Sequence, residues 1–184
     1  TILHEYVAPY PIQFEDASYG LQQLGSTTEE TLIEVAANCT VLVPTNGTLG
    51  ATWTANGFDD SSWTSGATGV GYERSSGYDS YFNIDVESEM YGQRTSVYLR
   101  VPFTVGNVGE ISDLEMQLQY DDGFVAYLNG VEVGRDRATG SVTWASTASN
   151  DHTDSLASQF TPFDLGAYTN LLVEGTNVLA IHGL

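Results

Sequence analysis

The sequence contains no lysine. Its 184 residues include five basic residues, all arginine, against 24 Asp and Glu, which gives a formal net charge of −19. A chain without a basic stripe cannot release counterions from phosphates, so nucleic acid is not an expected partner. The same repulsion argues against anionic membranes and against sulfated or uronic polysaccharides. The charge suits a solvated extracellular surface and favours a neutral partner.

Cysteine and long apolar runs are also scarce. The single Cys39 excludes an internal disulfide and a cysteine-rich zinc site, and its valine neighbours predict that it is buried. No run approaches the roughly 20 apolar residues that cross a bilayer, and no signal-peptide pattern is present. Because the sequence begins at Thr1 and ends at Leu184 inside a strand-like run, we expect a piece of a longer chain. Whether the C-terminus of the domain is truncated stays open.

Period-two alternation, by contrast, is abundant. Residues 96–105 place apolar side chains on one face, which is typical of a half-buried strand. Pro102 within it cannot donate a ladder hydrogen bond, which favours an edge position or a bulge. Asn129-Gly130 between two apolar runs predicts a hairpin with a type I′ turn. The segment 177–182 is apolar on both faces, as expected of a central strand.

Turn-rich loops separate these segments, and only residues 164–173 look helical. The remaining strands are expected over 32–43, 68–72, 114–120, 141–144 and 158–163. Many short strands with little helix predict an all-β fold, an antiparallel β-sandwich of jelly-roll type. We place this domain over residues 31–184. Residues 1–30, which prolines and glycines interrupt, are expected to form an extended arm or the tail of a preceding domain.

The common catalytic motifs are missing. There is no Gly-x-Ser-x-Gly, no phosphate-binding Gly-rich loop and no His-Glu-x-x-His, so we do not expect an enzyme. Two carboxylate pairs, Asp59-Asp60 and Asp121-Asp122, lie beside turn residues. Such pairs suit Ca²⁺, which takes oxygen ligands, but aspartate also caps turns without any metal. Glycoside hydrolysis also uses two carboxylates, at a separation that the sequence does not give.

Aromatic residues are frequent in Gly- and Ser-rich loops. A flat ring suits the apolar face of a sugar, whereas a buried ring serves only as a core residue, and both interpretations remain open. The rings concerned are Trp53, Trp63, Trp144, Tyr72, Tyr78, Tyr81 and Tyr91. His152 lies in a polar loop, where it is either solvated or a ligand of metal or sugar. His182 lies in an apolar strand, which predicts a hydrogen-bonded core residue.

One hairpin is similar to that of a known family. Residues 120–135 resemble the hairpin of galactose-binding-like β-sandwiches, through Asp121-Asp122-Gly123, Tyr127-Leu128-Asn129-Gly130, Glu132-Val133 and Arg135. Segments 58–72, 98–103 and 175–182 also match in the family's order, so the resemblance covers roughly residues 35 to 184. It implies a module of the kind appended to secreted bacterial hydrolases and large surface proteins.

Two further resemblances concern calcium and the N-terminus. A similar hairpin in protective-antigen-type sugar-binding domains holds Ca²⁺ at the glycan site, which implies the same role for Asp121 and Asp122. Residues 10–13 and 18–20 look like the segment that joins such modules to a lamin-tail-like domain.

The leading hypothesis is a non-catalytic carbohydrate-binding module of a secreted or cell-surface bacterial protein. It would bind a neutral glycan by ring stacking and polar side chains, with Ca²⁺ at Asp121 and Asp122 and with neighbouring domains as further partners. The candidate sugar-binding residues are Trp144, Asn150, His152, Arg135 and Tyr72. The alternatives are a structural or adhesive spacer, which predicts buried loop aromatics and no cleft, and a hydrolase, which needs a carboxylate pair with shifted pKa values.

Overall fold

The computed structural model describes residues 27–74 and 77–184. The chain divides into two units, Thr1–Glu30 and Thr31–Leu184, and the description below concerns the second. The expected N-terminal arm falls almost wholly outside the described residues, as do the lamin-tail-like segments 10–13 and 18–20.

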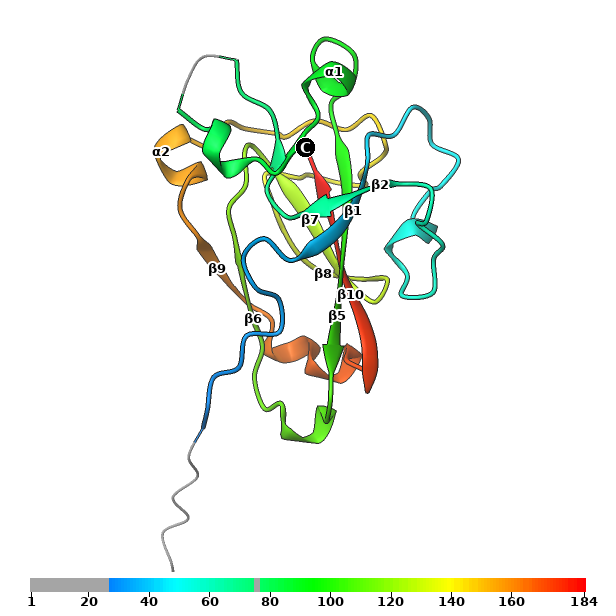
Figure 1. Ribbon diagram of the computed structural model, residues 1–184, viewed down its shortest axis with the longest axis vertical. Helices are drawn as coiled ribbons and strands as arrows, with labels where there is room; N and C mark the ends of the chain where they lie inside the picture. The colour runs from blue at the N-terminus through cyan, green and yellow to red at the C-terminus, as the bar shows by residue number, and fades with distance from the viewer. Residues whose placement is uncertain (1–26, 75–76) are drawn as a thin grey trace, which may run out of the picture. The chain divides into compact units, whose positions relative to one another are not determined.

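A six-stranded antiparallel sheet forms the main layer of the described part of the chain (Figure 1). The long strands β5 and β10 lie at its centre and pair over nine residues. The strands run in the order β2 (Thr64–Ala67), β1 (Asn38–Leu42), β5 (Val97–Val105), β10 (Gly175–Gly183), β7 (Phe124–Leu128) and β8 (Val131–Asp136).

Two strand pairs and several short helices complete the described elements. Strands β6 (Glu115–Leu118) and β9 (Thr161–Asp164) pair antiparallel, whereas β3 (Val70–Gly71) and β4 (Ile84–Asp85) pair parallel. The helices are α1 (Glu87–Met90), α2 (Asp154–Ala157) and the 3-10 turns η1 (Thr52–Thr54), η2 (Asp79–Tyr81), η3 (Val108–Glu110) and η4 (Gly166–Leu171). No helix in the described ranges is long and apolar enough to cross a bilayer. The all-β sandwich is confirmed.

The predicted hairpin and central strand are present. Asn129 and Gly130 have φ values of 50° and 94°, so both residues adopt the positive φ that a type I′ turn requires. Strand β10 lies between β5 and β7, as its apolar sequence predicts. Pro102 lies in β5, whose pairing with β1 ends at Arg100, so the proline occupies a stretch where that side of the strand has no neighbour.

Other predicted elements differ from the structure. The strand expected over 32–43 is reduced to β1, and residues 141–144 form a loop. In that loop the Ser146 hydroxyl accepts a hydrogen bond from the Thr143 N–H, and the Ser146 N–H donates to the Thr143 carbonyl. Side-chain bonds of this kind offer the backbone an alternative to a sheet ladder, which is why the apolar pattern failed here.

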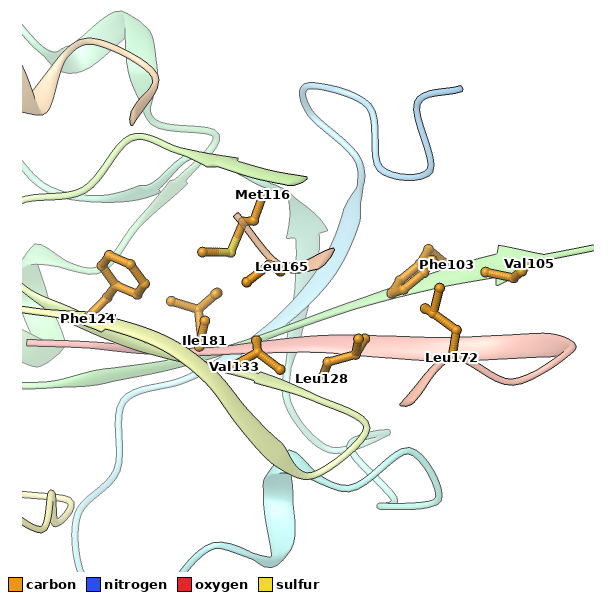
Figure 2. Packing of buried hydrophobic residues seen from close by; sticks show 10 residues of the cluster. Phe103, Val105, Met116, Phe124, Leu128, Val133, Leu165, Leu172 and Ile181 are labelled. Carbon is orange, nitrogen blue, oxygen red and sulfur yellow. The ribbon is translucent and has the colours of Figure 1, made fainter. Parts of the chain in front are cut away.

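Alternation along the strands gives the main sheet two different faces. On one face Phe124, Leu128 and Ile181 lie beneath Met116 and Leu165, as Figure 2 shows. These residues belong to the largest buried apolar cluster of the described chain. The side chains that alternate with them point to the opposite face, which is called the outer face below.

A loop covers the outer face because Arg100 holds it there. The Arg100 side chain is 3% exposed, and its Nε donates to the Asp60 carboxylate at 2.6 Å. Its other nitrogens donate to the carbonyls of Trp53, of Ala55 at 2.9 Å and of Phe58 at 3.4 Å. The guanidinium therefore fixes the backbone around η1 in place, and Arg100 is a structural residue.

Candidate functional site

An aromatic hollow of about 400 Å³ opens on the outer face of the main sheet. Loop 47–54 forms one wall, loop 142–144 forms another, and strands β5, β7 and β10 supply the floor. The lining residues are Gly47, Gly50, Ala51, Trp53, Thr54, Tyr98, Tyr127, Val142, Thr143, Trp144 and His182. We call this set the aromatic hollow.

The floor of the aromatic hollow follows from strand register. Tyr98 of β5 and His182 of β10 are direct cross-strand partners and so point to the same face. Their rings meet edge to face with centroids 4.8 Å apart. Trp53 is 2% exposed and stacks on Tyr98, with ring centroids 4.1 Å apart. It meets Tyr127 edge to face, with ring centroids 6.1 Å apart. Each ring is thus held by its neighbours.

Trp144 forms a wall of the hollow and is only partly buried. Its carbonyl accepts a hydrogen bond of 2.7 Å from the hydroxyl of the buried Ser96, which anchors the loop. Its ring lies directly against Gly47, where an added Cβ would stand 2.8 Å from Cδ1. The glycine therefore makes room for the ring, and any side chain there would displace it.

None of the described residues that line the aromatic hollow has a charged side chain at neutral pH. Burial lowers the pKa of His182 to about 4, so its imidazole is neutral near pH 7. Burial also raises the pKa of Tyr98, with a smaller contribution from Tyr127, and raises the pKa of Tyr127 itself. Both phenols therefore stay protonated. The lining offers flat rings and neutral hydroxyl, phenol and imidazole groups.

His152 and the paired aspartates lie in a different environment, which we call the aspartate cluster: Tyr120, Asp121, Asp122, Asp136, Arg137 and His152. His152 is 3% exposed, so its interpretation as a solvated loop histidine is wrong. Its backbone N–H donates to Asp122 Oδ1 at 2.9 Å, and its Nδ1 donates to the Tyr120 carbonyl at 2.8 Å. The ring also stacks on Tyr120 at 4.3 Å. These contacts hold the loop that leads to α2.

Asp136 is also paired within the aspartate cluster. The Tyr120 hydroxyl donates to Asp136 Oδ2 at 2.5 Å, and Arg137 forms an ion pair with the same carboxylate. Partial burial and the adjacent Asp122 raise the pKa of Asp121 to about 6. Among residues 27–74 and 77–184, no three His, Cys, Asp or Glu side chains are grouped to hold a metal ion. Calcium binding at Asp121 and Asp122 stays a prediction.

The other predicted sugar-binding residues lie outside the aromatic hollow. Arg135 is paired with Glu132 through two bonds of 2.5 and 2.6 Å and donates to the carbonyls of Ala138 and Gly140. Asn150 is exposed in the loop before His152. Tyr72 packs against the cluster around Val86 and meets Tyr91 edge to face. Of the five candidates, Trp144 alone is among the described residues that line the hollow.

A second, larger hollow of about 540 Å³ lies over β1, β5 and β10. Its floor holds the Arg100–Asp60 ion pair, and the Thr40 hydroxyl donates to the same carboxylate at 2.8 Å. Asn56 in its wall donates to the Thr176 carbonyl at 2.6 Å. Because these polar groups already bind one another, this hollow is a weaker candidate than the aromatic one.

Sequence reasoning missed Tyr98, Tyr127 and His182 as site residues. The signal was present, because each of them alternates with core residues in a strand and therefore points to the outer face. His182 is buried as predicted, but the expectation that it is hydrogen-bonded is wrong, since its Nε2 has no partner among the described residues.

No protein-family profile matches the sequence, and no curated protein matches it. Among solved structures, the chain is similar to a β-glucuronidase from an uncultured Clostridium sp., with 16% identity, a TM-score of 0.50, and coverage of 89% of this chain and 24% of that one. A Bifidobacterium dentium β-glucuronidase gives 14% identity, a TM-score of 0.48, and coverage of 90% and 22%.

A β-glycosidase from Bacteroides vulgatus gives 14% identity, a TM-score of 0.45, and coverage of 82% and 16%. The chain thus spans about a quarter or less of the length of these glycosidases. At such identity the similarity to the Clostridium enzyme concerns the fold: this chain has the β-sandwich architecture of a domain found within a glycosidase.

Proposed function

We propose that this domain is a non-catalytic carbohydrate-binding module that binds a neutral glycan in the aromatic hollow. The observation that carries the proposal is the lining itself, in which the partly exposed Trp144 stands over a floor of Tyr98, Tyr127 and His182. A sugar ring presents C–H groups to an aromatic face and hydroxyls to neutral polar groups. A volume of about 400 Å³ suits one sugar unit or a short oligosaccharide.

Electrostatics support a neutral ligand. A uronic or sulfated sugar would need a cation nearby, and the described lining of the aromatic hollow includes no arginine. Arg100 and Arg135 are both engaged in ion pairs and carbonyl contacts elsewhere. The net charge of −19 adds a general repulsion against acidic glycans.

The similarity to a domain of a β-glucuronidase supports a role in carbohydrate metabolism. In our proposal the domain is one module of a secreted or cell-surface bacterial protein, and it holds the glycan while any chemistry takes place on another domain. The residues of the described chain that line the aromatic hollow include no carboxylate pair, which supports binding over hydrolysis. Release of reducing sugar by the isolated chain would contradict this part of the proposal.

Trp144→Ala tests the proposal after an array of neutral glycans has identified a ligand. We expect this variant to bind about tenfold more weakly or worse by calorimetry, because a stacked ring contributes about 1.4 kcal/mol or more. Gly47→Ala, which displaces the Trp144 ring without removing it, should weaken binding by a smaller factor. Phe160→Ala is the matched control, since Phe160 is 49% exposed and lies outside the lining.

Two results would overturn the proposal. One is the absence of binding to every neutral glycan by the folded chain. The other is equal affinity of the Trp144→Ala and Phe160→Ala variants, which would place the ligand elsewhere.

A structural spacer is the second candidate function. It is favoured by Trp53 and Trp63, which are 2% and 8% exposed and act as core residues beneath the outer-face loop. Under this candidate, a glycan would leave the quenching of tryptophan fluorescence by acrylamide unchanged. Protection of Trp144 by a glycan would favour the binding module.

A further inference from the structure

His182 lines the aromatic hollow and has an unsatisfied polar atom. The residue is 3% exposed, and its Nε2 is buried without a hydrogen-bond partner in the described part of the chain. A buried polar group without a partner destabilises a fold, and an apolar residue at the same position would not have this cost. His182 is therefore unexplained by the packing of the domain alone.

The surroundings of His182 are aromatic. Its ring meets Tyr98 edge to face at 4.8 Å and Trp53 at 6.2 Å. On the same face of the sheet its neighbour across the other strand pair is Val125, which offers no polar side chain. No polar side chain among the described residues pairs with this nitrogen, and His182 belongs to the lining of the hollow.

We propose that the His182 imidazole recognises a hydroxyl group of the sugar bound in the aromatic hollow. This inference rests on the proposed function and adds the atom-level basis of its selectivity. A neutral imidazole carries one donor and one acceptor nitrogen, and a hydroxyl group is both donor and acceptor. A carboxylate pairs only with the tautomer that carries a proton on Nε2, and an ammonium pairs only with the other tautomer, whereas a hydroxyl group pairs with either. A site built in this way discriminates against the analogue that lacks the hydroxyl.

Ring-nitrogen NMR of the whole 184-residue chain tests the contact without any substitution. The probes are the methyl pyranosides of galactose, glucose and mannose, each added to saturation. We expect the ring ¹⁵N resonances of His182 to shift with the probe that binds. His152 is an internal control because it is equally buried but already bonded to the Tyr120 carbonyl, so its resonances should stay in place.

A double-mutant cycle supplies the second readout. The binding probe and its monodeoxy analogues are titrated into the native chain and into the His182→Phe variant. One deoxy analogue should bind the native chain about tenfold more weakly, as expected for one lost hydrogen bond, and the variant should not distinguish it from the parent sugar.

The outcomes separate the two proposals. In one case a probe binds the native chain but not Trp144→Ala, the His182 resonances do not move, and His182→Phe binds the deoxy analogue as weakly, relative to the parent sugar, as the native chain does. The hydroxyl contact is then overturned and the binding function stands. If no probe binds the folded chain, both are overturned. If His182→Phe fails to fold, the NMR result on the native chain decides.

Discussion

His182 and His152 are each 3% exposed, yet they occupy opposite surroundings. In the aspartate cluster, the Nδ1 of His152 donates to the Tyr120 carbonyl, its ring stacks on Tyr120, and its N–H donates to Asp122. In the aromatic hollow, His182 is enclosed by rings, and its Nε2 has no partner among the described residues. The His152 N–H and Nδ1 are thus both bonded within the protein, whereas the buried Nε2 of His182 has no partner among the described residues.

This difference decides which region is the better binding site. The aspartate cluster contains three of the seven candidate site residues, Asp121, Asp122 and His152, but its charges and hydrogen bonds are used to hold loops together. The aromatic hollow contains fewer conspicuous residues, and its lining is neutral and partly open. A site that binds an external molecule needs groups that the protein itself leaves available.

The largest expected effect is a loss of stability in acid that originates at His182. Burial lowers the pKa of this residue from 6.5 to about 4. Between these two pH values His182 is protonated in the unfolded chain and neutral in the folded chain. The free energy of unfolding should therefore fall as the pH drops from 6.5 to 4, by about 3 kcal/mol, and level off below. Urea denaturation at several pH values, in the presence of a chelator, measures this change.

The control for this prediction is His182→Phe, in which the free energy of unfolding should depend much less on pH between 6.5 and 4. Asp121 acts in the opposite direction, because its pKa is raised to about 6 and its folded form gains a proton between pH 6 and 3.8. Water around this carboxyl screens the effect, so it should not cancel that of His182. A stability that is constant from pH 6.5 to 4 in the native chain would contradict the neutral buried imidazole.

The next largest effect compares the two histidines directly at pH 7. His152→Phe should lower the free energy of unfolding by about 1–3 kcal/mol, because it leaves the partly buried Tyr120 carbonyl without its donor. His182→Phe removes an atom without a partner and should be close to neutral. Chemical denaturation of the two variants side by side gives the difference, and the reverse order would invalidate the comparison.

The smallest effect concerns calcium at the aspartate cluster. If Asp121 and Asp122 bind Ca²⁺ as the sequence pattern predicts, a free Ca²⁺ concentration ten times the dissociation constant stabilises the fold by about 1.4 kcal/mol. The melting temperature should rise with added Ca²⁺ and not with Mg²⁺, and Asp122→Asn should abolish the rise. Asp59→Asn is the matched control, from the other carboxylate pair. An unchanged melting temperature would end the calcium hypothesis.

The fold was more predictable than the site. Asn129-Gly130 and the alternation along β5 and β10 depend on local backbone preferences and on burial, so the hairpin and the central strands could be predicted. Trp144 was identified because it is a large ring in a loop. His182 was misjudged because the sequence shows an apolar strand but cannot show whether a neighbouring strand or loop brings a polar partner.

Arg135 illustrates the same difficulty. A basic residue in a very acidic chain attracted attention as a ligand contact, yet it forms a two-bond pair with Glu132, three residues earlier in the same strand. The pairing of β7 with β8 shifts register beside this pair, and the Ala138 and Gly140 carbonyls reach Arg135 through the loop that follows β8. Neither the shift nor the loop closure can be derived from spacing along the sequence.

The most direct test is a crystal structure of the chain with the neutral glycan that binds it most tightly. We expect a sugar ring against Trp144, with a hydroxyl group at His182, inside the aromatic hollow. A glycan seated instead on the aspartate cluster, in contact with Asn150 and His152, would contradict it.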